Sequence, residues 1–263
     1  MIGPSDRDQA LEQPIASPRA SVRILGVRVD ALTYDDLLQE VSEFVAQRGP
    51  HQIATVNPEF VMEARRNARF QAVLEGSDLC LADGVGLLWA ARAQGTPLPE
   101  RVTGSDGVPL IAEQAALAGW RIYLLGAALG VAERAGDVLA LQFPGLAIAG
   151  ALPGSPSDTD APGIIACIRQ AQPDILFVAY GAPAQDLWIA SHGRELGVPV
   201  MMGVGGAFDH ITGVRRRAPR WVQRFNLEWL YRLATQPWRW RRQLALPRFA
   251  WAVLREARGR RDR

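Results

Sequence analysis

HQIATVNPEFVMEARRNARFQAVLEGSDLCLADGVG, residues 51–86, is the stretch that decides the fold. Its first part, 51–56, is short, apolar and β-branched, which predicts a buried strand. Pro58 ends that strand, because proline has no N–H for the ladder, and it suits the first turn of a helix. One helix is then expected, with apolar side chains at helical spacing: Phe60, Val61, Ala64, Ala68, Ala72 and Val73. A second buried strand, 77–82, completes a strand–helix–strand unit.

Polar side chains follow both strands of this unit. Thr55 and Asn57 stand at the end of the first strand, and Asp83 follows the second. In a parallel α/β sheet, function gathers where strands end, so we expect these three side chains to share one rim. Each also has a structural interpretation: Thr55 and Asn57 as turn formers, and Asp83 as the cap of the following helix. For Asp83, spacing alone favours the cap over a general base.

The rest of the chain continues this alternation of strands and helices. A strand pair around Gly26 is expected over 22–33, followed by a helix over 33–48 with Thr33 as its N-cap. Four further apolar runs predict buried strands: 120–127, 146–152, 174–181 and 198–206. Helices are expected between them. The predicted fold class is therefore α/β, a Rossmann-like, mostly parallel sheet with helices on both faces.

Composition divides the chain into three parts. Residues 1–21 are rich in Pro, Ser and charge and lack the apolar core of a signal peptide, so a disordered tail is expected. Residues 22–212 are expected to form the α/β body. Residues 213–263 hold 15 Arg against three acidic residues, a formal charge of +12, so that the first 212 residues carry −10. Five of the eight Trp also lie in this last part, which is predicted to be a helical appendage.

The appendage has the pattern of amphipathic helices. Four apolar side chains recur at i, i+4 spacing: Trp221, Phe225, Trp229 and Leu233. Pro247 lies in a second helical segment, where it is expected either to kink the helix or to mark the start of a new one. A solvated surface does not explain the Trp content, and the acidic body opposes binding to nucleic acid. Binding to an anionic membrane explains the spacing, the Trp and the Arg together.

Composition also argues against several classes of protein. Cys80 and Cys167 lie in apolar runs, which indicates buried thiols and an intracellular setting. The chain has no run of about 20 apolar residues that could span a membrane. Its three histidines are scattered and no Cys/His cluster has metal-ligand spacing, so neither a metal site nor a cofactor is expected.

Three glycine turns follow strong strands, at Gly126–Gly130, Gly181–Pro183 and Gly203–Gly206. Each places backbone N–H groups at a helix N-terminus, where phosphate is favoured. Any α/β fold needs such turns, yet three on successive strands favour a nucleotide-type ligand. The first turn is GxxxG and not the GxGxxG of a dinucleotide site.

Four more polar residues near these turns are candidates, each with a structural alternative. Gln185 and Asp186 fall in the first turn of a helix, where Asp186 would compensate the helix dipole. Asp209 follows the third glycine turn and either caps it or binds a ribose or base edge. Arg101 either pairs with Glu100 at the surface or reaches a phosphate.

Taken together, the motifs resemble one known family, the WecG/TagA/CpsF glycosyltransferases. The similar segments occur in the family's order: TVNPEFVMEARRNARFQAVLEGSDLCLADGVGLLWAAR, PERVTGSDGVPLI, GAALGVAERA, GAPAQDLWI, GVGGAFDHITG and RRAPRWVQRFNLEWLYRLATQPWRWRRQL. The resemblance covers roughly residues 22–245.

The resemblance implies an enzyme that moves an N-acetylmannosamine-type sugar, or a related hexose, from a UDP-sugar to a polyprenyl-diphosphate-linked sugar in cell-surface polysaccharide biosynthesis. It implies inversion at the anomeric carbon without a divalent metal. It also implies a cytoplasmic protein that is peripheral on the inner face of the plasma membrane, with dimers or trimers of the body. One alternative is a non-catalytic nucleotide-sugar-binding or assembly protein at the membrane. A weaker one is an Arg-rich nucleic-acid-binding protein.

The resemblance also implies roles for particular residues. Asp83 matches the catalytic base, Thr55 and Asn57 flank the sugar pocket, and Arg101 contacts sugar or phosphate. The implied contacts to the donor and to a diphosphate are Gly126, Gly181, Gln185, Asp209, Arg232, Arg239 and Arg242. The chain departs from the family pattern at Ala184, where lysine is usual, and at Asp186, where glutamate is usual.

Overall fold

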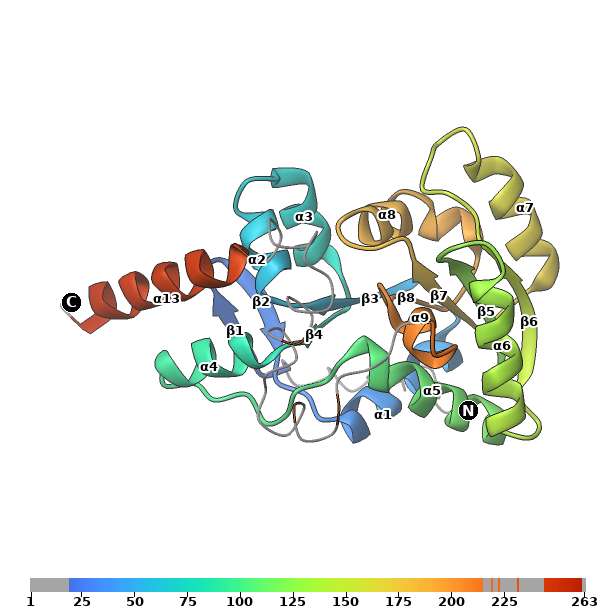
Figure 1. Ribbon diagram of the computed structural model, residues 1–263, viewed down its shortest axis with the longest axis horizontal. Coiled ribbons are helices and arrows are strands. Elements are labelled where there is room, and N and C mark those ends of the chain that lie inside the picture. The colour runs from blue at the N-terminus through green and yellow to red at the C-terminus, as the bar shows by residue number, and fades with distance from the viewer. Residues whose placement is uncertain (1–18, 215–218, 220–221, 223–230, 232–243, 262–263) are drawn as a thin grey trace, which may run out of the picture.

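The computed structural model describes residues 19–214, 219, 222, 231 and 244–261. Its centre is a six-stranded sheet in the order β4-β3-β8-β7-β5-β6, in which every neighbouring pair is parallel (Figure 1). The strands are β3 (His51–Val56), β4 (Leu79–Ala82), β5 (Arg121–Gly126), β6 (Ala147–Leu152), β7 (Ile175–Ala179) and β8 (Val200–Gly203). The predicted α/β class and the parallel sheet are confirmed.

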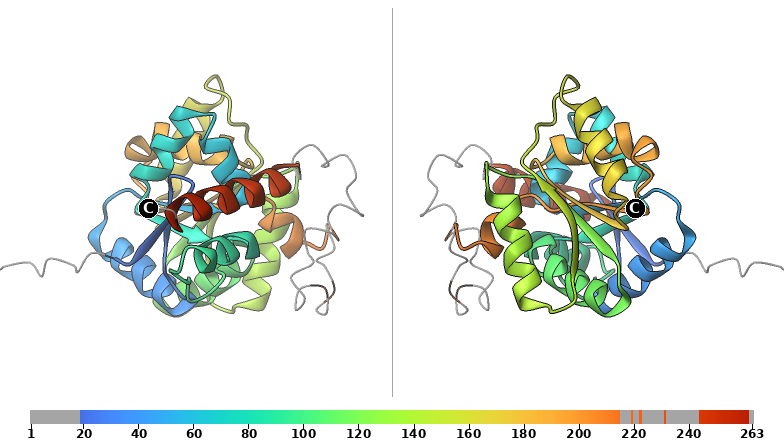
Figure 2. Two further views of the ribbon diagram at one scale, coloured as in Figure 1. Left: turned by 90° about the vertical axis from the view of Figure 1, so that its left-hand side faces the viewer. Right: turned by 90° about the vertical axis from the view of Figure 1, so that its right-hand side faces the viewer.

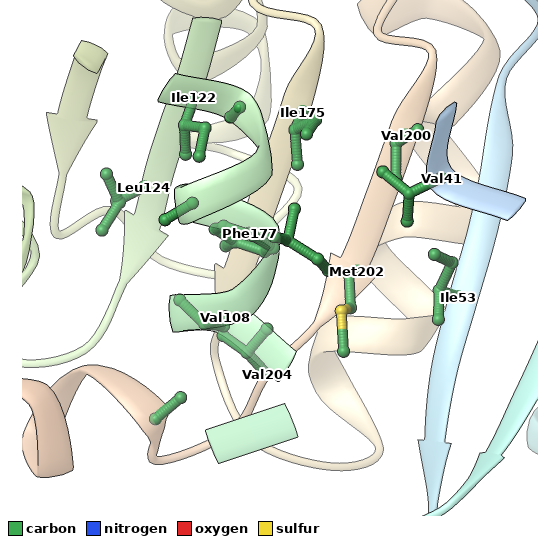
Figure 3. Close-up of a cluster of buried hydrophobic side chains, with 14 of the residues drawn as sticks. Val41, Ile53, Val108, Ile122, Leu124, Ile175, Phe177, Val200, Met202 and Val204 are labelled. Atoms are coloured by element: carbon green, nitrogen blue, oxygen red, sulfur yellow. The ribbon is translucent and has the colours of Figure 1, made fainter. Parts of the chain in front are cut away.

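Helices cover both faces of this sheet. In Figure 1 one layer lies below the sheet: α1 (Tyr34–Gln47), α5 (Gly104–Ala118), α6 (Val131–Gln142) and α9 (Ala207–Ile211). The layer above the sheet holds α2 (Pro58–Ala64), α3 (Ala68–Gly76), α7 (Ala161–Ala171) and α8 (Ala184–Leu196). Side chains alternate along each strand, so that Phe177 and Met202 face the lower layer (Figure 3), whereas Val178 and Met201 face the upper one.

A small hairpin stands beside this sheet. β1 (Ser21–Ile24) pairs antiparallel with β2 (Val27–Asp30), and the two-residue turn between them has positive φ at both Leu25 and Gly26. Two positive φ values are the geometry of the tight hairpin turn that matches strand twist. The strand pair predicted around Gly26 is confirmed, as is the Thr33 cap of α1, whose side chain accepts a hydrogen bond from the Asp36 N–H.

The prediction of one helix after Pro58 is wrong, because the structure has two helices there, α2 and α3. Asn67 is the N-cap of α3, and its carboxamide oxygen accepts a hydrogen bond from the Phe70 N–H at 3.1 Å. A side chain that satisfies a backbone donor in this way favours a new helix start over continuation of the old one. The expectation of two buried thiols is also half wrong. Cys80 is buried beneath α3, whereas Cys167 lies on the exposed side of α7.

The described part of the appendage ends in α13 (Ala245–Arg261). Pro247 lies in the first turn of this helix, which fits the predicted restart, because a first-turn proline gives up no helical hydrogen bond. Buried Phe249 and Val253 join the apolar cluster of α2 and α4 (Val85–Ala93), so α13 is packed against the body (Figure 2). None of the described helices combines the length and the apolar content that crossing a bilayer requires.

Candidate active site

At the carboxyl edge of the sheet, neighbouring strands lead into helices on opposite layers. The chain leaves β3 into α2 on the upper layer and leaves β8 into α9 on the lower layer, although these strands are neighbours (Figure 1). The same divergence occurs between β5, which leads into α6, and β7, which leads into α8. Ligands of open α/β sheets bind where neighbouring connections diverge. After the roles that the family resemblance implies, we call the gap at β3 and β8 the acceptor crevice and the gap at β5 and β7 the donor crevice.

Thr55 lies on the floor of the acceptor crevice. Its side chain is buried, and its hydroxyl donates to the carbonyl oxygen of Gly203 at 2.9 Å. A Cβ on Gly104 would lie 3.3 Å from the Thr55 methyl group, so the first turn of α5 packs directly on this side chain. Thr55 therefore holds the ends of β3 and β8 together beneath the crevice.

Asp83 stands at the edge of the same crevice, directly after β4. Its backbone N–H donates to the carbonyl of Val56 at 2.7 Å, which fixes its turn against the end of β3, and its side chain is half-buried. Gly84, and not Asp83, occupies the N-cap position of α4. The N-cap position that spacing alone favoured for Asp83 is thus taken by Gly84.

Asn57 is packed against the turn that carries Asp83. It is the N-cap of α2, and its side-chain oxygen accepts from the Phe60 N–H at 3.1 Å. Behind it, a Cβ on Gly86 would lie only 2.7 Å from the Pro58 ring, so only glycine allows α4 to approach α2 so closely. The expectation that Thr55, Asn57 and Asp83 share one rim is confirmed, and the interpretation of Asn57 as a local capping residue agrees with its hydrogen bond.

Tyr34 organises the loop that carries Arg101. The Tyr34 backbone N–H donates to the Glu100 carboxylate at 3.0 Å, and its phenolic oxygen accepts from the Thr103 N–H at 3.0 Å. Burial raises the pKa of Tyr34, and the negative charges of Asp106 and Asp83 raise it further. Asp83 and the Tyr34 phenol thus lie within electrostatic reach of each other.

Arg101 itself is half-buried between these two anchor points. Glu100, which sequence alone offers as its surface partner, directs a carboxylate oxygen at Tyr34. Sequence reasoning missed Tyr34, because it lies 67 positions from Arg101 and no motif marks it.

The donor crevice is shaped by backbone. Gly126 ends β5 with φ of +106°, and a Cβ there would lie 2.8 Å from the carbonyl carbon of Ala179. Across the crevice, Gly181 opens the turn into α8, and the Ala182–Pro183 bond is cis. The first turn of α6 begins at Gly130, which has no side chain to cap it. Free helix N-termini of this kind favour phosphate oxygens.

Gln185 links the two crevices from below. It is only 1 % exposed, and its side-chain oxygen accepts from the Gly181 N–H at 3.1 Å and from the Gly205 N–H at 2.9 Å. The turns after β7 and β8 are thereby tied to one atom. A direct contact of Gln185 with the donor stays a prediction, because the observed hydrogen bonds make it a support for both loops.

Asp186 lies in the first turn of α8, as the sequence predicts, but it is buried under these turns, which the sequence did not indicate. It is fully enclosed, and neither carboxylate oxygen has a hydrogen-bond partner of good geometry among the described residues. Burial raises the pKa of Asp186 to about 7. Dipole compensation, the role that its place in α8 suggests, requires a charge that this burial disfavours.

Asp209 lies in the first turn of α9, half-buried beside Gly206 at the far end of the acceptor crevice. Arg232, Arg239 and Arg242 fall outside the residues that the structure describes. In the parts that it does describe, no three His, Cys, Asp or Glu side chains converge as metal ligands would.

Comparison with known proteins gives a consistent answer. The sequence model described as the glycosyl transferase WecG/TagA/CpsF family matches residues 22–263. A protein of Bacillus spizizenii is 37 % identical over 206 residues, which are 78 % of this chain and 79 % of that relative. A Bacillus subtilis protein is 33 % identical over 234 residues, 89 % and 90 % of the two chains.

A Staphylococcus aureus protein is 29 % identical over 247 residues, 92 % and 95 % of the two chains. All three relatives carry the name N-acetylglucosaminyldiphosphoundecaprenol N-acetyl-beta-D-mannosaminyltransferase.

Proposed function

Because this chain belongs to the WecG/TagA/CpsF family of glycosyltransferases, we propose that it transfers an N-acetylmannosamine-type hexose from a UDP-sugar to a polyprenyl-diphosphate-linked sugar. The acceptor class follows the names of the relatives, whose acceptor is an N-acetylglucosaminyl diphosphoundecaprenol. In this proposal, transfer inverts the anomeric carbon and needs no divalent metal. The product belongs to cell-surface polysaccharide biosynthesis.

The observation that carries the proposal is the place of Asp83. It is a half-buried carboxylate at the carboxyl end of β4, on the rim of the acceptor crevice and clear of the N-cap position. A sugar hydroxyl is a weak nucleophile, so a base must accept its proton as the new bond to the anomeric carbon forms. Asp83 is the base in this mechanism. The acceptor hydroxyl, as it loses its proton to Asp83, attacks the anomeric carbon from the face opposite to the departing UDP, so the anomeric configuration inverts.

The donor crevice supplies the other half of the mechanism. As the bond from the anomeric carbon to UDP breaks, negative charge grows on the leaving diphosphate. The backbone N–H groups at the start of α6, held open by Gly126 and Gly130, face a diphosphate in this crevice. Fixed N–H donors stabilise such charge most strongly where water is excluded. Arg101, on the loop that Tyr34 anchors, neutralises further negative charge.

The appendage brings the enzyme to a lipid-borne acceptor. Arg accounts for most of its charge. On α13, the side chains of Trp251 and Leu254 are 64 % and 45 % exposed to solvent. Exposed Trp and Leu beside Arg are the side chains that enter an anionic membrane interface. The proposed enzyme is accordingly peripheral on the cytoplasmic face of the plasma membrane.

A screen of UDP-sugars against synthetic lipid-diphosphate acceptors, with mass detection of the product, tests this function. We expect UDP release only when donor and acceptor are both present, unchanged turnover in EDTA, and an anomeric configuration in the product opposite to that of the donor. Binding of the UDP-sugar without transfer to any acceptor would instead support the non-catalytic alternative.

A further inference from the structure

A groove runs between α2 and α13, outside the two crevices. It consists of three linked hollows of about 440, 400 and 440 Å³, all of which Arg65 lines. The hollow at one end reaches Glu59 at the start of α2 and the Ala182–Pro183 turn, both of which follow strand ends at the rim. The hollow at the other end reaches Leu25 in the hairpin turn. The groove therefore leads away from the rim along α2 and α13, which pack against each other.

Two arginines that line this groove have no ion-pair partner among the described residues. They are Arg65, the C-cap of α2, and Arg248 on α13, and both are exposed. Both line the hollow at the rim end together with Glu59, Glu63 and Arg66, of which Glu63 and Arg66 pair with each other. Two such guanidinium groups from packed helices fit a phosphate group, because guanidinium binds phosphate oxygens through paired hydrogen bonds.

The middle of the groove is apolar. Besides the two arginines, its lining consists of Met62 on α2 and of Pro247, Trp251 and Ala252 on α13. Arg255 lies over the Trp251 ring, 5.5 Å from its centre, and continues the lining toward the hairpin. A cationic rim end followed by an apolar track matches a molecule with an anionic head and a hydrocarbon chain.

The groove is also connected to the proposed base. Phe249 of α13 contacts the first turn of α4, since a Cβ on Gly86 would lie 3.7 Å from its ring, and Asp83 lies three positions before Gly86. The helix that presents Arg248 is thus packed on the turn that follows Asp83. A ligand held by Arg248 is held on the same rigid unit as the catalytic rim.

We infer that this groove binds the lipid acceptor, with its diphosphate between Arg65 and Arg248 and its first prenyl units along Met62 and Trp251. The inference rests on the proposed function. It assigns the groove to a prenyl diphosphate, and not to the headgroups of the membrane at large, because the head-binding and chain-binding parts lie in one track that starts at the active-site rim. Each methylene of the chain that becomes buried tightens binding by about fourfold through the hydrophobic effect.

Steady-state kinetics of the full-length protein test the inference with two acceptors that share one sugar-diphosphate head. One carries a long polyprenyl chain in mixed micelles, and the other a short, water-soluble chain. Arg65→Ala/Arg248→Ala should raise KM for both acceptors by about tenfold to hundredfold, as loss of hydrogen bonds to a charged group does. Met62→Ala should raise KM only for the long acceptor, by about threefold to tenfold.

The matched control is Arg169→Ala/Arg194→Ala, which removes the same charge from exposed positions in the last turns of α7 and α8. It should leave both acceptor KM values unchanged, and KM for the UDP-sugar should be unchanged in every variant. A photoreactive prenyl diphosphate without a sugar should cross-link to residues of α2 and α13, which does not depend on turnover.

Two results overturn the inference while the proposed function stands. One is normal acceptor KM in Arg65→Ala/Arg248→Ala together with weaker sedimentation with anionic vesicles, which would assign the arginines to membrane headgroups. The other is cross-linking confined to residues outside α2 and α13. Failure of the wild-type protein to transfer any sugar would instead overturn the proposed function itself.

Discussion

The hydroxyl of Thr55 donates to the carbonyl oxygen of Gly203 at 2.9 Å, across the gap between two strands whose following helices diverge. The paired register of β3 and β8 extends only to Ile53 and Met202, so this side chain takes over where the ladder ends. One hydrogen bond thus sets the width of the acceptor crevice at its floor.

Thr55→Val should therefore destabilise the protein. The substitution keeps the shape but removes the only donor that the side chain offers, and it leaves a buried carbonyl with one partner fewer, which costs about 1–3 kcal/mol. Urea unfolding measures this loss. Thr55→Ser keeps the hydroxyl and should lose much less stability; equal losses in the two variants would mean that the methyl packing, and not the hydrogen bond, matters at this position.

Asp83→Asn should retain the fold and the affinity for UDP but lose turnover. An amide cannot take a proton from the acceptor hydroxyl, and removal of a general base costs about 10²–10⁴ in rate. Single-turnover transfer and UDP titration report the two properties separately. Asp137→Asn, an exposed acid on α6, is the control and should behave as wild type. Near-normal turnover of Asp83→Asn would remove Asp83 from the role of base.

Tyr34→Phe should lower kcat without preventing folding. The substitution removes the phenolic oxygen that accepts from Thr103 and therefore loosens the loop of Arg101. Tyr34 is a positioning residue in this argument, and displacement of a supporting loop costs about tenfold or more in rate. The double variant with Asp83→Asn should lose less than the product of the two single losses, because both changes act on one step. Full additivity would show that Tyr34 acts elsewhere.

Asp186 should make stability depend on pH in an unusual direction. Its pKa is about 7 in the folded protein, above the ordinary value of 3.8, so between these values the folded state holds a proton that the unfolded state has released. The contribution of this group to stability is therefore complete below pH 3.8 and falls as the pH rises toward 7. The loss is on the order of 1–4 kcal/mol. The free energy of unfolding, measured at pH 5 and at pH 8, gives this loss in the wild type. In Asp186→Asn, the part of the difference between the two pH values that Asp186 causes should be absent.

Leu244→Ser/Leu254→Ser should weaken binding to anionic vesicles. Both leucines are exposed on or next to α13, at 40 % and 45 %, outside the α2–α13 groove lining. Sedimentation with vesicles of increasing anionic lipid content measures the effect. The control is Leu117→Ser/Leu141→Ser. These two leucines lie in the last turns of α5 and α6, and each is 86 % exposed. Equal effects of the two pairs would contradict a membrane-facing α13.

The sequence predicted all six strands of the sheet, because each is an apolar run that ends at a glycine or proline signal. It also placed Thr55, Asn57 and Asp83 on one rim, since the ends of parallel strands must meet there. The break at Asn67 escaped prediction because the apolar spacing of α2 and α3 stays in phase through it. Tyr34, and the bridging role of Gln185, escaped for another reason: their partners lie far along the chain or are backbone atoms, and neither leaves a periodic pattern.

Gln185 gives the two crevices a shared mechanical element. One oxygen atom holds the Gly181 turn on the donor side and the Gly205 turn on the acceptor side. A donor that draws the Gly181 turn toward its diphosphate shifts the position of that atom and, with it, the Gly205 turn. In the proposed function we therefore expect the two substrates to be coupled in how they bind, with synergism as the kinetic signature: the dissociation constant of each substrate should fall when the other is bound.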